Sequence, residues 1–134
     1  MNNTVVIPPG TRVVVADGGG ARILRNAGSD GELSLEQVEL IDPAQLPLAT
    51  PAGSQPPEQS GEEAEEAGFA KRLAQRLNDD ALKHRYEHLV LMADAQTLGQ
   101  MRPLLHKETR ARLLAEYDKN LANSPLEDIA RALS

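Results

Sequence analysis

The chain of 134 residues contains no cysteine and no tryptophan, and aromatic residues make up only 2% of it. The absence of cysteine excludes disulfides, thiolate zinc sites and thiol nucleophiles. With so few rings, the core has to be aliphatic, and the aromatic surfaces that often line small-molecule pockets are lacking. We therefore expect no cofactor, no bound metal and no small-molecule ligand.

Long apolar runs and a surplus of positive charge are also lacking. No segment approaches the roughly 20 apolar residues of a membrane span, and the amino terminus lacks a secretory signal pattern, so we expect a cytoplasmic protein. The 14 Lys and Arg residues are outnumbered by 20 Asp and Glu residues, giving a net charge of -6. This balance argues against a protein that coats nucleic acid, because phosphate binding requires clustered cations. It is compatible with a local basic face.

The apolar pattern predicts three strands near the start of the chain. The β-branched run at residues 11–16 is typical of a strand buried on both faces, hence central in its sheet. Asp17-Gly18-Gly19-Gly20 suits a tight hairpin, and residues 21–25 form the returning strand. A third strand is expected over residues 33–41, which gives a meander.

Helices and strands are expected to alternate in the second half. Phe69, Leu73 and Leu77 recur every four residues within a predicted helix at residues 62–82. A buried strand at residues 89–93 precedes a helix capped by Asp94, and a fifth strand is expected at residues 112–117. A capping box at residues 124–127, with proline at the first helical position, begins the last helix.

This order, βββαβαβα, predicts one α/β domain over residues 1–134. A meander followed by crossover units gives a mixed five-stranded sheet with helices on its faces. The ribonuclease-H-like architecture has this order, and so does the central domain of archaeal and eukaryotic peptide-release factors. Residues 42–61 are rich in proline and glycine and are expected to form a flexible loop.

Three blocks, at residues 13–25, 68–82 and 88–121, resemble a bacterial family of proteins required for attachment to host cells. That family is itself similar to the release-factor central domain. The resemblance implies a binding module with a protein, a ribosome or RNA as partner. In release factors, the loop after the third strand carries the Gly-Gly-Gln that enters the peptidyl-transferase centre. Here the nearest match is Gly53-Ser54-Gln55, which lacks the double glycine and argues against peptidyl-tRNA hydrolysis.

The predicted contact surface combines this loop with the helix that follows it. Gly53 and Gln55 lie in the loop, and the helix carries three cations that could contact RNA phosphates. These cations are Lys71, Arg72 and Arg76. The oligomeric state is left open by the sequence.

A carboxylate cluster supplies the enzymatic alternative. Asp17, Asp94 and Glu66 lie roughly where metal-binding acids lie in the ribonuclease-H-like order, and such acids could hold Mg²⁺ for attack on a phosphodiester. Each acid also has an ordinary interpretation, as a turn residue, a helix cap and part of an acidic helix start. We therefore favour a non-enzymatic binding module over a Mg²⁺-dependent phosphoryl-transfer enzyme.

Overall fold

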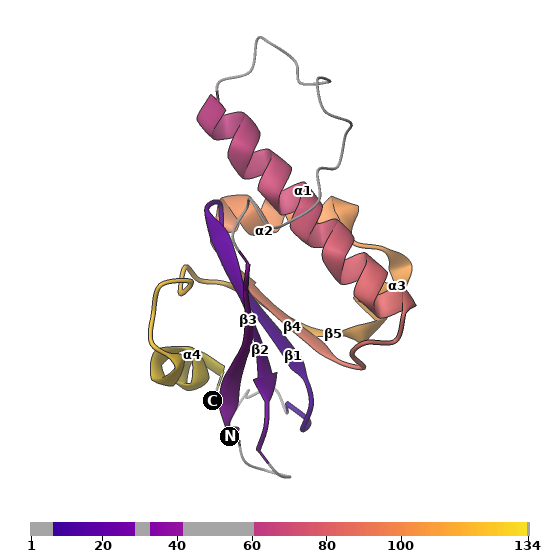
Figure 1. Cartoon of the computed structure of the whole chain (residues 1–134), viewed down its shortest axis with the longest axis vertical. Coiled ribbons are helices and arrows are strands. Elements are labelled where there is room, and N and C mark those ends of the chain that lie inside the picture. Colours follow the sequence, from indigo (N-terminus) through magenta and orange to yellow (C-terminus); the bar gives the residue numbers. More distant parts are fainter. Residues whose placement is uncertain (1–6, 29–32, 42–60, 134) are drawn as a thin grey trace.

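A five-stranded mixed sheet with the order β3-β2-β1-β4-β5 organises the chain (Figure 1). The computed structural model describes residues 7–28, 33–41 and 61–133, except for the side chains of residues 61–67. The predicted loop therefore lies outside the described residues, apart from Gly61, which begins a helix instead.

The three amino-terminal strands form an antiparallel meander: β1 (Arg12–Asp17), β2 (Gly20–Asn26) and β3 (Leu35–Ile41). On the other side of β1 lie β4 (Leu89–Ala93) and β5 (Leu113–Asp118), both in parallel register. As predicted, β1 is the central strand, and its residues from Val13 to Ala16 are fully buried. A β-branched run needs such a position because both of its faces are apolar.

Helices cover both faces of the sheet. On one face lie α1 (Gly61–Leu82), α2 (Ala95–Met101) and α3 (Lys107–Arg112), and α4 (Leu126–Leu133) lies on the other (Figure 1). A short 3₁₀ helix, η2 (Arg102–Leu104), joins α2 to α3. The predicted α/β domain with a mixed five-stranded sheet is thereby confirmed.

The alternation of β1 side chains separates two aliphatic cores. Val14 packs with the first group of helices, where Leu73 and Leu77 are fully buried, as their spacing predicted. Val13 packs on the opposite side with Ile129 of α4. The helices are thus held by apolar stripes on each face of the sheet.

Most predicted element boundaries differ from the structure by one or two residues. The third strand begins at Leu35, later than expected. The last helix begins at Leu126, so Pro125 precedes it rather than occupying its first position. The reason lies in the hydrogen bonds, because the carbonyl of Pro125 accepts from the backbone N–H of Ile129 at 3.3 Å, as a cap residue does. Within the described residues, no helix is both long and apolar enough to cross a bilayer.

Candidate functional site

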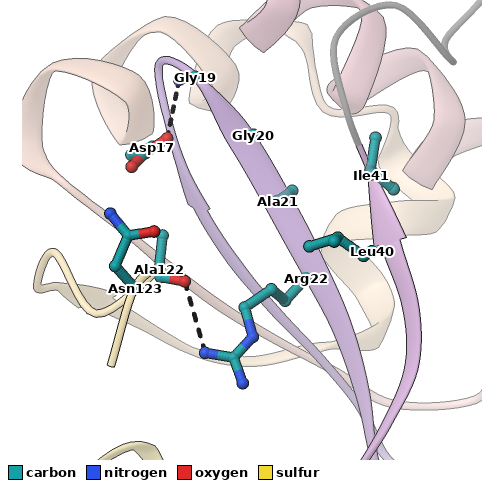
Figure 2. A pocket seen from close by; sticks show the side chains of 9 residues that line it. All are labelled: Asp17, Gly19, Gly20, Ala21, Arg22, Leu40, Ile41, Ala122 and Asn123. Atoms are coloured by element: carbon teal, nitrogen blue, oxygen red, sulfur yellow. Dashed lines mark hydrogen bonds between the residues drawn. The ribbon is translucent and has the colours of Figure 1, made fainter. Parts of the chain in front are cut away.

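A hollow of about 350 Å³ lies at the end of the sheet where β1 and β3 reach their last residues (Figure 2). The β1–β2 hairpin, the end of β3 and the segment before α4 all contribute to its wall. Its lining comprises Asp17, Gly19, Gly20, Ala21, Arg22, Leu40, Ile41, Ala122 and Asn123.

The hairpin sequence shapes one side of the hollow. Asp17 accepts a hydrogen bond from the backbone N–H of Gly19 through Oδ1 at 2.7 Å, which fixes the turn. A Cβ at Gly20 would lie 3.2 Å from the carbonyl oxygen of Ile41, so glycine permits the close approach of β2 and β3. The Asp17 carboxylate therefore forms part of the wall on the hairpin side.

Arg22 ties the segment before α4 to the sheet. Its Nη1 donates to the carbonyl oxygen of Ser124 at 2.5 Å and, more weakly, to that of Ala122 at 3.4 Å. Its Nε donates to Oε1 of Gln37 on β3 at 2.9 Å. Leu40 adds an apolar surface that is 62% exposed, so the hollow combines a carboxylate, a guanidinium and an aliphatic side chain.

Of the predicted acids, Asp17 lines this hollow, and Asp94 follows the neighbouring strand β4. Ala16 pairs with Ala93, which makes Asp17 and Asp94 neighbours across adjacent strand ends. Asp94 caps α2 by accepting from the N–H of Thr97 at 3.2 Å. Glu66 lies in α1 with its side chain outside the described residues. Among the side chains that the structure describes, no three carboxylate or imidazole groups gather in a way that could hold a metal, so the Mg²⁺-dependent alternative gains no support.

Comparison with known families decides the class of the domain. Over residues 10–133 the sequence matches bacterial archaeo-eukaryotic release factor family 12. The chain belongs to this family. The match spans every strand and helix described above, and it confirms the release-factor part of the resemblance. No curated protein matches the sequence. The likeness to ribonuclease H and the role in host attachment stay predictions.

The predicted cations of this family 12 member have different surroundings on α1. Lys71 is exposed. Arg72 is half-buried, and its Nε donates to the carbonyl oxygen of Gly68 at 3.2 Å. Arg76 forms ion pairs with Glu39 of β3 at 2.7 Å and with Asp80 at 3.0 Å. The predicted loop residues Gly53 and Gln55 lie outside the described residues, so their place in a contact surface stays a prediction.

Asp80 is the centre of an ion-pair network that the sequence reasoning missed. It is 4% exposed, and its Oδ2 accepts from Nη1 of Arg12 at 2.6 Å and from Nε of Arg76 at 3.0 Å. The Arg12 guanidinium also lies 4.8 Å from the ring centroid of Tyr86, within cation–π range. The one available signal was the spacing of Arg76 and Asp80, four residues apart on a helix.

The network sets the charge states of its members. Burial alone would raise the pKa of Asp80, but the hydrogen bonds from Arg12 and Arg76 outweigh it, and this pKa lies below its usual value. The hydrogen bond from Arg76 likewise lowers the pKa of Glu39. The same bond, followed by the one to Asp80, raises the pKa of Arg76 against the opposing effect of burial. Arg76 thus stays charged and joins α1 to β3.

Proposed function

We propose that this family 12 member is a non-enzymatic binding module that attaches to the translation machinery. The observation that carries the proposal is the family match over residues 10–133. That match includes the whole sheet and all of its described helices, so what the chain shares with the family is a complete domain rather than a short motif.

The contact surface that we propose consists of α1 and the neighbouring end of the sheet, where the β1–β2 hairpin lies. α1 begins on the side where the β1–β2 hairpin turns (Figure 1), and Lys71 is exposed about halfway along it. A net charge of -6 disfavours broad contact with RNA phosphates. The proposed attachment therefore depends on a few local cations and on contacts with protein. Arg76 supports α1 from within, because Glu39 and Asp80 hold its guanidinium.

The proposed module does not hydrolyse peptidyl-tRNA. Its segment between β3 and α1 contains Gly53-Ser54-Gln55, which lacks the second glycine of the release-factor loop. A missing glycine removes backbone freedom that no other residue supplies. We therefore propose that the domain binds its partner without hydrolysing peptidyl-tRNA.

A partner of this kind also bears on where the protein acts. Translation takes place in the cytoplasm, so we propose a cytoplasmic protein. An effect on attachment to host cells, as the sequence resemblance suggests, would then be indirect and follow from a change in which proteins are made.

Co-sedimentation with ribosomes at low and high salt tests this proposal. We expect the chain to enter the ribosomal pellet at low salt and to leave it as salt rises, because screening weakens contacts between charges. Lys71→Glu should reduce retention. Arg131→Glu makes the same charge change on α4, where the side chain is 74% exposed, and it should leave retention unchanged.

Two results would count against the proposal. A chain that stays in the supernatant at both salts would leave the family match as evidence of shared fold alone. Equal loss of retention in Lys71→Glu and Arg131→Glu would remove α1 as the contact surface, because only overall charge would then matter.

A further inference from the structure

Exposed leucines and cations gather where α1 ends beside η2 and α3, at the far end of α1 from the β1–β2 hairpin (Figure 1). Leu82 is 51% exposed and Leu104 is 41% exposed. The cations that are exposed on the same segments are Lys83, Arg85, Lys107 and Arg110. We call these leucines and cations together the α1–α3 surface.

Asn78 joins the helices that carry this surface. Its Nδ2 donates to the carbonyl oxygen of Leu104 at 2.9 Å, and its Oδ1 accepts from the backbone N–H of His106 at 2.8 Å and from the hydroxyl of Thr109 at 2.7 Å. Leu82 lies four residues beyond Asn78, so the two side chains share one side of α1. The exposed leucines therefore lie on neighbouring elements that Asn78 holds together.

The turn that follows α1 is also fixed to α3. Nη1 of Arg112 donates to the carbonyl oxygen of Tyr86 at 3.3 Å, and its Nη2 lies 3.3 Å from Nδ1 of His84. Lys83 and Arg85 flank His84 in this turn. The cations of the turn and those of α3 are therefore presented side by side.

This surface is positive, although the net charge of the chain is -6. Lys83 and Lys107 form no ion pair with any side chain that the structure describes. The exposed carboxylates on the same segments are those of Asp79 and Glu87, and Glu108 is paired with an arginine of α3 at 3.8 Å. The exposed cations thus outnumber the exposed carboxylates, and such a surface attracts an anionic partner.

The leucines distinguish between two kinds of anionic partner. Single-stranded RNA binds to cations and to aromatic rings on which its bases stack, but the rings of Phe69 and Tyr86 are buried and Tyr117 is half-buried on β5. Leu82 and Leu104 gain nothing from a phosphate, whereas they are stabilised when apolar side chains cover them. The surface therefore fits an acidic polypeptide better than a nucleic acid.

The described residues that adjoin the undescribed ones lie away from this surface. Ile7 and Leu33 pack on the α4 side of the sheet. Ile41 lies at the end of the sheet that carries the β1–β2 hairpin. Gly61 begins α1, a helix of 22 residues, and is therefore about 30 Å from the end at Leu82.

We propose that the α1–α3 surface binds an acidic segment of another protein. The segment places apolar side chains on the two leucines and carboxylates beside the surrounding cations. An acidic amphipathic helix has this pattern, because apolar residues three or four positions apart form one stripe and leave its flanks to Asp and Glu. The inference does not depend on ribosome binding, for which Lys71 is the tested residue.

Fluorescence anisotropy with a labelled synthetic peptide tests the proposal. The probe has Leu at every third or fourth position and Glu, Asp or Ala elsewhere. We expect the full chain to bind it, with an affinity that falls as salt rises. A peptide with Ser in place of Leu, a peptide with Gln and Asn in place of Glu and Asp, and an oligouridylate should each bind more weakly.

Charge reversal on the surface should weaken binding of the peptide. We expect Lys83→Glu/Lys107→Glu to raise the Kd about tenfold, because like charges then face each other. The matched control is Lys119→Glu/Arg131→Glu, which makes the same charge change at exposed side chains before and on α4. It should leave the Kd unchanged.

Removal of the leucines tests the apolar part of the surface. Leu82→Ser/Leu104→Ser should also raise the Kd about tenfold. Val38→Ser/Leu40→Ser makes the same kind of change at two exposed side chains of β3 and should have no effect.

Amide chemical-shift mapping on the wild type keeps the test valid if a variant does not fold. The peptide should shift amide signals of residues 82–85 and 104–110. A wild-type chain that does not bind the peptide, shifts confined to other residues, or equal weakening in the matched controls would overturn the proposal. Tighter binding of the oligouridylate than of the peptide would overturn it too, with RNA as the partner instead of protein.

Discussion

Replacing Asp80 by Asn should lower the stability of this fold substantially, because Asp80 is buried on α1 and accepts hydrogen bonds from two arginines. The substitution keeps the size of the side chain and removes only its charge. The Asp80 side chain is 6% exposed, and the guanidinium groups of Arg12 and Arg76 that it accepts from are 16% and 29% exposed. Both arginines would be left with a neutral partner in a place where water reaches them poorly.

The magnitude follows from burial. Breaking a fully buried ion pair from one side costs about 3–5 kcal/mol, but the two arginines are partly solvated and Arg76 keeps its bond to Glu39. We therefore expect Asp80→Asn to lower the free energy of unfolding by about 2–3 kcal/mol. Glu39→Gln is the matched control. Its side chain is 40% exposed, so its loss should stay below about 1 kcal/mol.

Urea unfolding of the wild type, Asp80→Asn and Glu39→Gln at several pH values measures the loss in the free energy of unfolding for each variant. The pKa of Asp80 is lowered in the fold from 3.8, so the unfolded chain takes up this proton first on acidification. The contribution of the carboxylate is therefore fully present above about pH 4 and is lost as pH falls through the folded pKa. The gap between wild type and Asp80→Asn should be wide at pH 7 and narrow only below about pH 4. A gap under about 1 kcal/mol at pH 7, or one that is the same at pH 3, would refute the reasoning.

Three further substitutions test the core, a cap and a buried hydroxyl. Leu73→Ala removes a fully buried side chain from α1 and should cost about 2–5 kcal/mol in urea unfolding; a loss under 1 kcal/mol would contradict its place in the core. Asp94→Ala removes the α2 cap and should cost about 1 kcal/mol, seen as a lower Tm, whereas an unchanged Tm would show that the cap is dispensable. Tyr86→Phe removes the hydroxyl that donates to the Leu77 carbonyl at 2.9 Å and should cost about 1 kcal/mol at pH 7. Burial raises the pKa of Tyr86, so the wild type alone should lose this contribution above about pH 10; equal losses in both proteins would point to other groups.

The fold was readable from the sequence because its signals are local. A β-branched run marks β1, a four-residue apolar spacing marks α1, and both patterns depend only on neighbours along the chain. The hairpin at Asp17 was predicted for the same reason. The β2–β3 register shift at Val38 was not predicted, because it depends on how two separate strands meet.

The site was less predictable because its contacts join distant residues. Arg12 meets Asp80 across 68 positions of sequence, and Arg22 meets Ser124 across 102. No periodicity relates such pairs. From the sequence, Arg76 was therefore predicted to contact RNA, whereas in the structure it links α1 to β3. The local roles of Asp17 and Asp94, in a turn and at a helix start, were both anticipated.

The central place of β1 has a consequence for the chain while it is being made. β1 can pair at once with β2, but its other edge waits for β4, since Arg12 pairs with Leu89 and the two are 77 positions apart. At about 5–20 residues per second of synthesis, that edge stays open for about 4–15 s. During this interval the nascent meander presents an apolar strand to its surroundings. A pause in elongation between β3 and β4 should therefore favour aggregation, whereas a pause after β4 should not.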